Sequence, residues 1–377
     1  MNTVTKLPKL HGERVLVRVD YNVPIKGDKV LDGRRIDASY KTIDTIIKKG
    51  GTPVLLAHLG DASATLHPVA TYLSKKYKMV FVTHDLRDEK IEYILSLVPD
   101  KTLILLENIR RYEQEEQNDA KFAKAIAKLG KYYVNEAFPV SHRKHASVVG
   151  IPKHLPSFAG FQLETEIKNL NLVLQKPKHP FLFMLGGAKF GTKIPLLKRF
   201  SEVADQMVIS GAILNTFYKV AGFPVGKSVI EDGFEKDIKP LLKNPKLLLP
   251  TDVLVERKGK PENVSVDEVG EHDVIVDIGK ESVRLIKEKI AKAKLIVWNG
   301  PTGWYEKGYV KATNELGKAI IASKAHTVIG GGDTAEVMEK TLKKTDTKHI
   351  FISTGGGAAL EYLAKGTLPG IVALEKK

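Results

Sequence analysis

Residues 327–338, with the sequence TVIGGGDTAEVM, have the composition of an anion-binding turn. A short β-branched run passes into three glycines, Gly330 to Gly332, and then into a segment with a helical pattern. Glycines let a backbone approach a phosphate closely, and a helix N-terminus offers free N–H groups and the positive end of a dipole. Asp333 and Glu336 have the spacing of a capping box, which predicts that Asp333 caps this helix. A tight strand–helix turn without a ligand is the alternative interpretation.

A second stretch of the same kind follows closely. Residues 353–363, STGGGAALEYL, again pass from a strand pattern through three glycines, Gly355 to Gly357, into a helical pattern. Two such stretches in succession arise by chance much less often than one. Together they would aim many backbone amides at one point, so we expect a shared phosphate site.

Two lysines follow another strand pattern in residues 183–193, FMLGGAKFGTK. Lys189 and Lys193 come after a pair of glycines, and on a helix they would share one face and point toward the strand end. The spacing resembles a Walker A loop, but Thr192 and Lys193 reverse the order that this loop requires. Lysines on a solvated helix face are the alternative interpretation.

The turn in residues 298–306, WNGPTGWYE, adds polar groups to the same half of the chain. Asn299 stands at its mouth, and Glu306 is in reach of a ribose or a similar diol. Gly211 follows a further strand pattern in this half. An ordinary Asn-Gly-Pro turn is the alternative interpretation of residues 298–306.

The first half of the chain carries different chemistry at its strand ends. Its motifs are RVDYNVP, GRRID, AHLGD, LLENIRRYE and SHRKHAS. They contain Asp20, Asn22, Arg35, His58, Arg110 and Arg143. Because arginine forks match carboxylate and phosphate oxygens bidentately, this half suits a compact anion. The glycine loops and lysines of the other half suit a nucleotide.

These side chains need elements that bring many strand ends together. We expect strands at residues 14–19, 53–57, 79–82, 102–106, 132–134, 181–185, 206–209, 274–276, 295–298, 327–329 and 350–352. Helical patterns separate them, and strand–helix–strand repeats form parallel sheets that are covered on both faces. We therefore predict an α/β fold with two doubly wound, Rossmann-like domains, whose ligands bind beyond the carboxyl ends of the strands.

The two domains are expected to meet near residues 151–180. A segment rich in proline and small residues precedes a leucine-rich helical pattern at residues 163–174, and the sequence PKHP ends that pattern. We interpret it as an interdomain helix within residues 157–176, between a first domain of residues 1–156 and a second of residues 177–364. One more helix of the first domain is the alternative.

Composition is typical of a soluble enzyme. The chain has 377 residues, which is long enough for two cores, and 43% of them are hydrophobic. It has no apolar run of about 18 residues and no apolar signal-peptide core, so we expect a cytoplasmic protein without a membrane partner. The absence of cysteine excludes thiolate chemistry. A net charge of +15 suits an anionic partner, and the low aromatic content of 7% favours phosphorylated metabolites over nucleic acid.

Taken in order, the motifs resemble those of the phosphoglycerate kinase family over almost the whole chain. The matching segments are RVDYNVP, LLENIRRYEQEE, YYVNEAFPVSHRKHAS, LPSFAGFQLETEI, LGGAKFGTKI, LIVWNGPTGWYE, TVIGGGDTAE and STGGGAALEYL. The resemblance implies reversible, Mg²⁺-dependent transfer of a phosphoryl group between ATP and the carboxylate of 3-phosphoglycerate, which yields ADP and 1,3-bisphosphoglycerate in glycolysis and gluconeogenesis. It also implies hinge bending and a C-terminal tail, residues 365–377, that returns to the first domain. We expect a monomer that binds no nucleic acid.

The resemblance also implies a role for each matching residue. The residues expected to bind 3-phosphoglycerate are Asp20, Asn22, Arg35, His58, Arg110 and Arg143. The residues expected to bind the nucleotide are Gly187, Lys193, Gly211, Asn299, Glu306, Gly331, Gly332, Asp333 and Thr334, with Asp333 also on the Mg²⁺ side. The residues expected to act on the transferring phosphoryl group are Arg35, Lys189, Gly355 and Gly356. The acceptor carboxylate is already ionised at neutral pH, so no general base is needed.

The chain departs from the family pattern in three places. Asp61 stands where the family usually has an arginine beside the substrate phosphate, and Lys144 and Arg111 are candidates to compensate. GTK replaces the usual SDK of the lysine motif, and Thr302 and Trp304 alter the NGP loop. The alternatives are a Rossmann-type NAD-dependent dehydrogenase, whose GxGxxG fingerprint we do not find, and a nucleic-acid binder without turnover.

Overall fold

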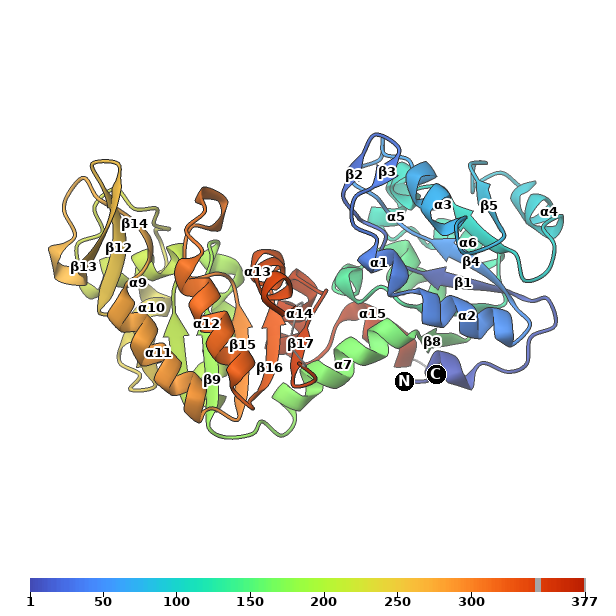
Figure 1. Cartoon of the computed structure of the whole chain (residues 1–377). Coiled ribbons are helices and arrows are strands. Elements are labelled where there is room, and N and C mark those ends of the chain that lie inside the picture. Colours follow the sequence, from blue (N-terminus) through green and yellow to red (C-terminus); the bar gives the residue numbers. More distant parts are fainter. Residues whose placement is uncertain (343–346, 376–377) are drawn as a thin grey trace. The chain divides into compact units, whose positions relative to one another are not determined.

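The structure, a computed structural model, describes residues 1–342 and 347–375. The chain forms two compact units (Figure 1). The first contains Met1–Lys168 and the described part of the segment that starts at Thr367, and the second contains Asn169–Gly366. The division falls inside α7 (Phe161–Leu174), within the segment expected to join the domains. Among the described residues, no helix is long and apolar enough to cross a membrane.

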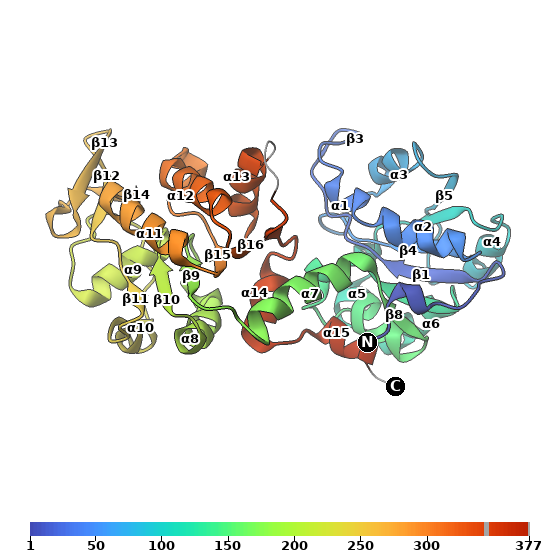
Figure 2. The same cartoon turned by 60° about the horizontal axis from the view of Figure 1, so that its bottom comes forward.

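The first unit is built on a six-stranded parallel sheet with the strand order β5-β6-β4-β1-β7-β8. Its strands are β1 (Arg14–Arg18), β4 (Thr52–Leu56), β5 (Met79–Val82), β6 (Leu103–Leu106), β7 (Tyr132–Asn135) and β8 (Ser157–Ala159). The central strands read as continuous apolar runs, such as LILL in β6, because helices cover both faces of the sheet. Figure 2 shows α2 (Tyr40–Lys48) and α3 (His67–Leu73) on one face, with α5 (Glu113–Glu116) and α6 (Ala120–Ala127) on the other.

Shorter elements complete this unit. They are a hairpin of β2 (Ile25–Lys26) and β3 (Lys29–Val30), α1 (Arg34–Asp37), and α4 (Ile91–Ser96). The final described helix, α15 (Pro369–Glu375), also packs on the first unit: the Gly370 N–H donates to the Ser141 carbonyl at 2.8 Å, and Ile371 and Leu374 are buried. Residues 376–377 of the expected tail lie outside the described residues.

The second unit repeats the plan with the strand order β11-β10-β9-β15-β16-β17, again all parallel. Its strands are β9 (Phe181–Leu185), β10 (Gln206–Ile209), β11 (Leu247–Leu248), β15 (Leu295–Asn299), β16 (His326–Gly330) and β17 (Ile350–Ile352). Its helices are α8 (Ile194–Val203), α9 (Ala212–Ala221), α10 (Glu235–Leu242), α11 (Lys280–Lys292), α12 (Lys311–Ala322), α13 (Gly332–Leu342) and α14 (Gly357–Lys365). Figure 2 shows α11, α12 and α13 on one face of the sheet, and α8, α10 and α14 on the other. The two sheets confirm the predicted α/β class.

A third, antiparallel sheet is the main difference from the predicted topology. It consists of β12 (Asp252–Arg257), β13 (Lys260–Ser265) and β14 (Val274–Ile278), in the order β13-β12-β14. The expectation that residues 274–276 belong to a parallel sheet is therefore wrong, because β14 pairs antiparallel with β12. A two-residue turn joins β12 to β13, and both of its residues, Lys258 and Gly259, have positive φ. Such a turn connects antiparallel strands only.

Candidate active site

The triple-glycine turn after β16 is built as a helix N-terminus. Gly331 has φ of 91°, a conformation that side chains disfavour, and its carbonyl accepts the first helical hydrogen bond from the Ala335 N–H at 2.9 Å. Helix α13 therefore begins at Gly332, and Gly331 stands at the capping position. The predicted capping role of Asp333 is wrong for this reason. Asp333 lies inside the first turn, where its negative charge still faces the positive end of the helix dipole.

The second triple-glycine turn lies at the neighbouring strand end. Strand β17 pairs with β16 in parallel, so the carboxyl ends of both strands lie at the same edge of the sheet. Gly356 has φ of 50°, and α14 begins at Gly357. Two helix N-termini thus follow adjacent strands, which concentrates partial positive charge at this edge.

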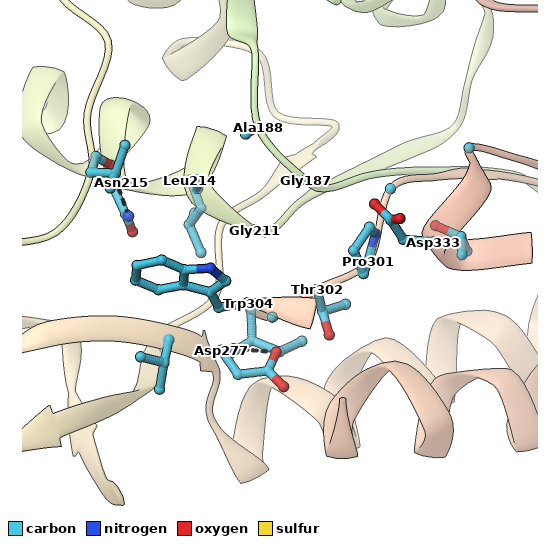
Figure 3. Close-up of a pocket in the computed structure, with 18 of the residues that line it drawn as sticks. Gly187, Ala188, Gly211, Leu214, Asn215, Asp277, Pro301, Thr302, Trp304 and Asp333 are labelled. Atoms are coloured by element: carbon cyan, nitrogen blue, oxygen red, sulfur yellow. Dashed lines mark hydrogen bonds between the residues drawn. The ribbon is translucent and has the colours of Figure 1, made fainter. Parts of the chain in front are cut away.

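A cavity of about 500 Å³ opens at the carboxyl ends of β9, β15 and β16. Figure 3 shows Gly187, Gly211, Leu214 and Asn215 along one side of it, Asp277, Thr302 and Trp304 along the other, and Asp333 toward one end. The predicted residues that line the cavity are Gly187, Lys189, Lys193, Gly211, Asn299, Glu306, Gly331, Asp333 and Thr334. Gly332, Gly355 and Gly356 are not among the described lining residues. The structure therefore brings together eight of the nine predicted nucleotide-binding residues, together with Lys189.

The two lysines of the cavity do not share a helix face, contrary to the sequence prediction. Lys189 has a left-handed backbone with φ of 63° and precedes a short 3₁₀ turn, whereas Lys193 precedes α8. Pro195 in the first turn of α8 fixes the start of that helix after Lys193, since proline lacks an N–H and is tolerated there. Each lysine therefore reaches the cavity from a separate turn.

Lys193 is buried, and its Nζ donates to the carbonyl of Gly186. Burial lowers the pKa of its ammonium to about 8, although Glu231 and Asp333 favour the charged form. A cation held in a partly dry pocket interacts with an anion more strongly than a surface lysine does.

Carboxylates border the same end of the cavity. Burial raises the pKa of Asp333, and the nearby charges of Glu306 and Glu336 raise it further, while Lys193 opposes the shift. Both Glu306 and Asp333 line the cavity. A ligand that brings phosphate or a cation would therefore change the pKa of Asp333.

The antiparallel sheet and α9 also line the cavity, from opposite sides. The Trp304 N–H donates to the Val276 carbonyl at 2.8 Å, which ties the loop after β15 to β14. Beside them Asp277 is buried, and burial raises the pKa of its carboxyl to about 6. Leu214 and Ile275 add apolar surface. Sequence analysis did not identify Leu214 or Ile275, since apolar residues inside a helix or strand carry no motif.

The first unit assembles its polar residues around the end of β1. The guanidinium of Arg35 pairs with Asp20 at 2.9 Å between Nη1 and Oδ2, and it also donates to the Asn22 carbonyl at 3.3 Å. The Asn22 side chain accepts from the Gly60 N–H at 3.0 Å. Arg110 donates to the carbonyl of Gly60. These contacts link four of the predicted acceptor-site residues through two short loops.

His58 is held as a neutral donor by the arginines around it. Its Nδ1 lies 3.1 Å from Nη2 of Arg18, and arginine can only donate, so Nδ1 accepts and the proton of the neutral ring is on Nε2. Burial lowers the pKa of His58 to about 2, and the charges of Arg18, Arg110 and Arg143 contribute. The predicted residues Arg110 and Arg143 therefore lie in the same cationic cluster as His58.

Arg18 is a site residue that sequence analysis did not single out. It is 1% exposed, and its Nε donates to Ser147 Oγ at 2.8 Å. The Ser147 hydroxyl in turn donates to buried Glu115 at 2.5 Å. An arginine within the apolar strand RVLVR was the available signal, because a buried charge requires partners.

The Asp61 side chain hydrogen-bonds within the turn that contains it, to Ser63. Its Oδ1 accepts from the Ser63 N–H at 2.8 Å and from the Ser63 hydroxyl at 2.6 Å, and these bonds lower the pKa of the exposed carboxyl. Arg111 pairs with Glu107 at 3.3 Å. Lys144 is exposed. Of the two candidates to compensate for Asp61, Arg111 therefore already has an anionic partner.

Together, these features define a class of protein. One unit carries a cavity bordered by a helix N-terminus and two lysines, and the other carries a cluster of arginines and a neutral histidine. Two doubly wound units equipped in this way are typical of a phosphotransferase that uses a nucleotide and an anionic acceptor.

Comparison with known proteins identifies the family. The model of the family "Phosphoglycerate kinase" matches residues 4–366. Phosphoglycerate kinases of Coprothermobacter proteolyticus and Finegoldia magna are each 38% identical, covering 97% and 98% of this chain and 97% and 98% of their own lengths. The structure of phosphoglycerate kinase from Coxiella burnetii covers 99% of this chain and 98% of its own, with a TM-score of 0.87 at 33% identity, and that from Pyrococcus horikoshii OT3 has a TM-score of 0.86 at 28% identity.

The chain belongs to the phosphoglycerate kinase family. It is a kinase that transfers a phosphoryl group to a carboxylate, an activity of glycolysis. The alternative of an NAD-dependent dehydrogenase finds no support in these comparisons.

Nucleotide affinity is predicted to fall as the pH rises through about 8, where free Lys193 loses its proton. A bound phosphate favours the protonated form, so the dissociation constant of ADP should rise by up to about tenfold per pH unit above this point. Calorimetric titration between pH 7 and pH 10 measures this. Lys193→Met should bind ADP weakly with a flat profile, whereas Lys198→Met, a change of an exposed lysine paired with Asp237, should keep the wild-type profile. A flat wild-type profile would contradict the assignment.

Proposed function

We propose that the second unit binds ATP or ADP, that the first binds 3-phosphoglycerate or 1,3-bisphosphoglycerate, and that the chain transfers the phosphoryl group reversibly between them with Mg²⁺. The observation that carries this proposal is the cavity at the start of α13, where a helix N-terminus and buried Lys193 meet. Such a combination favours phosphate because backbone N–H groups and a desolvated cation act together.

The nucleotide is proposed to lie along the length of the cavity. Its base would contact the apolar wall that includes Leu214, Ile275 and Trp304, and Glu306 would accept from the ribose hydroxyls. Its phosphates would face Gly331, Thr334 and Lys193. The buried hydroxyl of Thr334 supports this direction, since its Oγ1 has no hydrogen-bond partner within the described chain and stands in the first turn of α13.

Mg²⁺ is proposed to bind on the side of Asp333. Burial and the negative charges of Glu306 and Glu336 raise the pKa of Asp333, and a divalent cation beside Asp333 would favour its ionised form. Within the described residues, no group of three or more acidic or histidine side chains is arranged for a metal. This suits Mg²⁺, which commonly takes one or two carboxylates and completes its shell with phosphates and water. When bound, the ion would neutralise phosphate charge.

The acceptor is proposed to bind through the arginine cluster of the first unit. Arg35, Arg110 and Arg143 would neutralise its phosphate and carboxylate, and the Nε2–H of His58 would donate to an oxygen. Asp20 and Asn22 would hold Arg35 and the substrate hydroxyl. Since the attacking carboxylate is ionised, the first unit needs charge and alignment but no base.

Transfer requires that the two ligands meet in line. We propose that the units close about the segment around α7 when both substrates are bound, and that Lys189 and Arg35 then balance the charge on the transferring group. The amides of Gly355 and Gly356, at the start of α14, would face the same oxygens. We further propose that the chain acts as a cytoplasmic monomer and has no nucleic-acid partner.

A coupled assay with NADH oxidation tests the proposed function directly. We expect turnover that requires ATP, 3-phosphoglycerate and Mg²⁺ together, and loss of turnover with EDTA that returns on addition of excess Mg²⁺. Lys193→Met should remain folded by circular dichroism and raise the KM for ATP, because it removes the buried cation. Well-folded wild-type protein that shows no turnover with all three components present would refute the proposal.

The unusual Asp61 gives a second prediction. Its ionised carboxylate lies beside the loop of Gly60, which Arg110 and Asn22 contact, so it should repel the acceptor phosphate. Asp61→Arg should lower the KM for 3-phosphoglycerate by about tenfold, with little change in kcat. Asp61→Asn, which removes only the charge, should fall between the two. A KM that is unchanged in both variants would show that the substrate phosphate lies elsewhere.

A further inference from the structure

A second basic hollow lies in the second unit, at the edge of the sheet opposite to the nucleotide cavity. It measures about 790 Å³. Its charged or titratable lining residues are Lys178, Lys287, Lys294, Lys324, His326 and His349. The remaining described lining residues are alanines and one serine, and none is acidic. Because ligands of open parallel sheets bind at the carboxyl edge, the amino edge has no part in the proposed kinase site.

Four of these basic residues lie at the amino ends of neighbouring strands of the sheet. Lys178 precedes β9, Lys294 immediately precedes β15, His326 begins β16, and His349 immediately precedes β17. These four strands are neighbours in the order β9-β15-β16-β17. The His326 N–H donates to the Lys294 carbonyl at 3.0 Å, and the Thr327 N–H donates to the His349 carbonyl at 2.8 Å. The amino ends of these four strands lie about 4.8 Å apart, so two lysines and two histidines gather at one edge of the sheet.

Two helices bring further cations and only part of the opposing charge. Lys287 lies on α11, and Lys324 follows the end of α12. The carbonyl ends of these two helices offer about half a negative charge each, and Glu315 adds one near Lys287, which leaves about two of the four lysine charges unbalanced. Lys287 has a long ion pair of 3.8 Å with Glu315. No ion pair joins Lys178, Lys294 or Lys324 to an acidic side chain in the described part of the chain.

The excess of positive charge affects the two histidines of the hollow. The pKa of His326 is lowered by burial and further by Lys178 and His349. The Nε2 atoms of His326 and His349 are buried, and neither has a hydrogen-bond partner within residues 1–342 and 347–375. A multivalent anion would reduce the repulsion among the lysines and favour protonation of the imidazoles.

We propose that this hollow, the amino-edge site, binds a short linear chain of linked phosphates, such as an inorganic oligophosphate. Four lysines spread over the strand ends and two helices, together with two histidines, match an extended anion with several charges better than a single phosphate. Nucleic acid is disfavoured because no Phe, Tyr or Trp lines the hollow to stack on bases, and because the basic groups converge on one concavity. The proposal does not depend on the proposed kinase function.

Calorimetric titration with inorganic tripolyphosphate at constant ionic strength tests the proposal. The double variant Lys178→Ala/Lys324→Ala should lose one binding site or weaken it at least tenfold. The control Lys236→Ala/Lys239→Ala removes the same charge from exposed positions on α10 and should bind as the wild type does. In the wild type, NMR signals of His326 and His349 should shift on addition of tripolyphosphate, and the pKa of His326 should rise.

Three outcomes would overturn the proposal. One is equal affinity and stoichiometry in the double variant and the wild type. Another is histidine signals that do not move at saturating tripolyphosphate. The third is binding of a single-stranded oligonucleotide, but not of tripolyphosphate, through Lys178 and Lys324. Kinase turnover should be the same in the wild type and in both double variants, because none of the changed lysines lines the nucleotide cavity.

Discussion

The parallel pairing of β9, β15, β16 and β17 is the constraint on which the nucleotide half of the site depends. Parallel strands end at the same edge of the sheet, so the turns that follow them lie close together. This holds even for the turns after β9 and β17, which are more than 160 residues apart in the sequence. Glycines allow these turns to be tight, and two helices start directly behind them. The partial positive charge at this edge is therefore a property of the backbone, and a few side chains tune it.

The cavity contains both a buried cation, Lys193, and a partly buried acid, Asp333. Lys193 is buried and donates to the Gly186 carbonyl, whereas burial and the nearby charges of Glu306 and Glu336 raise the pKa of Asp333. A phosphate group and a divalent cation would correct both imbalances at once. The first unit carries a cluster of arginines around neutral His58, and buried Arg18 is connected to Glu115 through Ser147. Phosphoryl transfer needs this kind of preparation more than it needs acid–base chemistry.

Much of this organisation was predictable from the sequence because it follows from local rules. Alternating strands and helices predict parallel sheets, and glycines after strands predict anion sites, so eight of nine expected nucleotide residues line one cavity. The misses have physical reasons. Strand β13 is polar and exposed, and β8 and β11 are very short, so none carries a period-two signal. Gly331 occupies the capping position expected for Asp333. The left-handed backbone of Lys189 and the 3₁₀ turn that follows it place Lys189 and Lys193 in separate turns, so backbone conformation overrode side-chain spacing.

We propose that Lys189 acts on the transferring phosphoryl group and contributes little to holding the nucleotide. Its left-handed backbone and its place at the cavity, outside any helix, are consistent with a positioned cation. The most direct test measures kcat and the dissociation constant of ADP for Lys189→Ala beside the surface control Lys198→Ala. We predict that kcat falls by a factor of about 10² to 10³, while the dissociation constant changes less than about threefold. Equal losses in turnover and in ADP affinity would contradict the account.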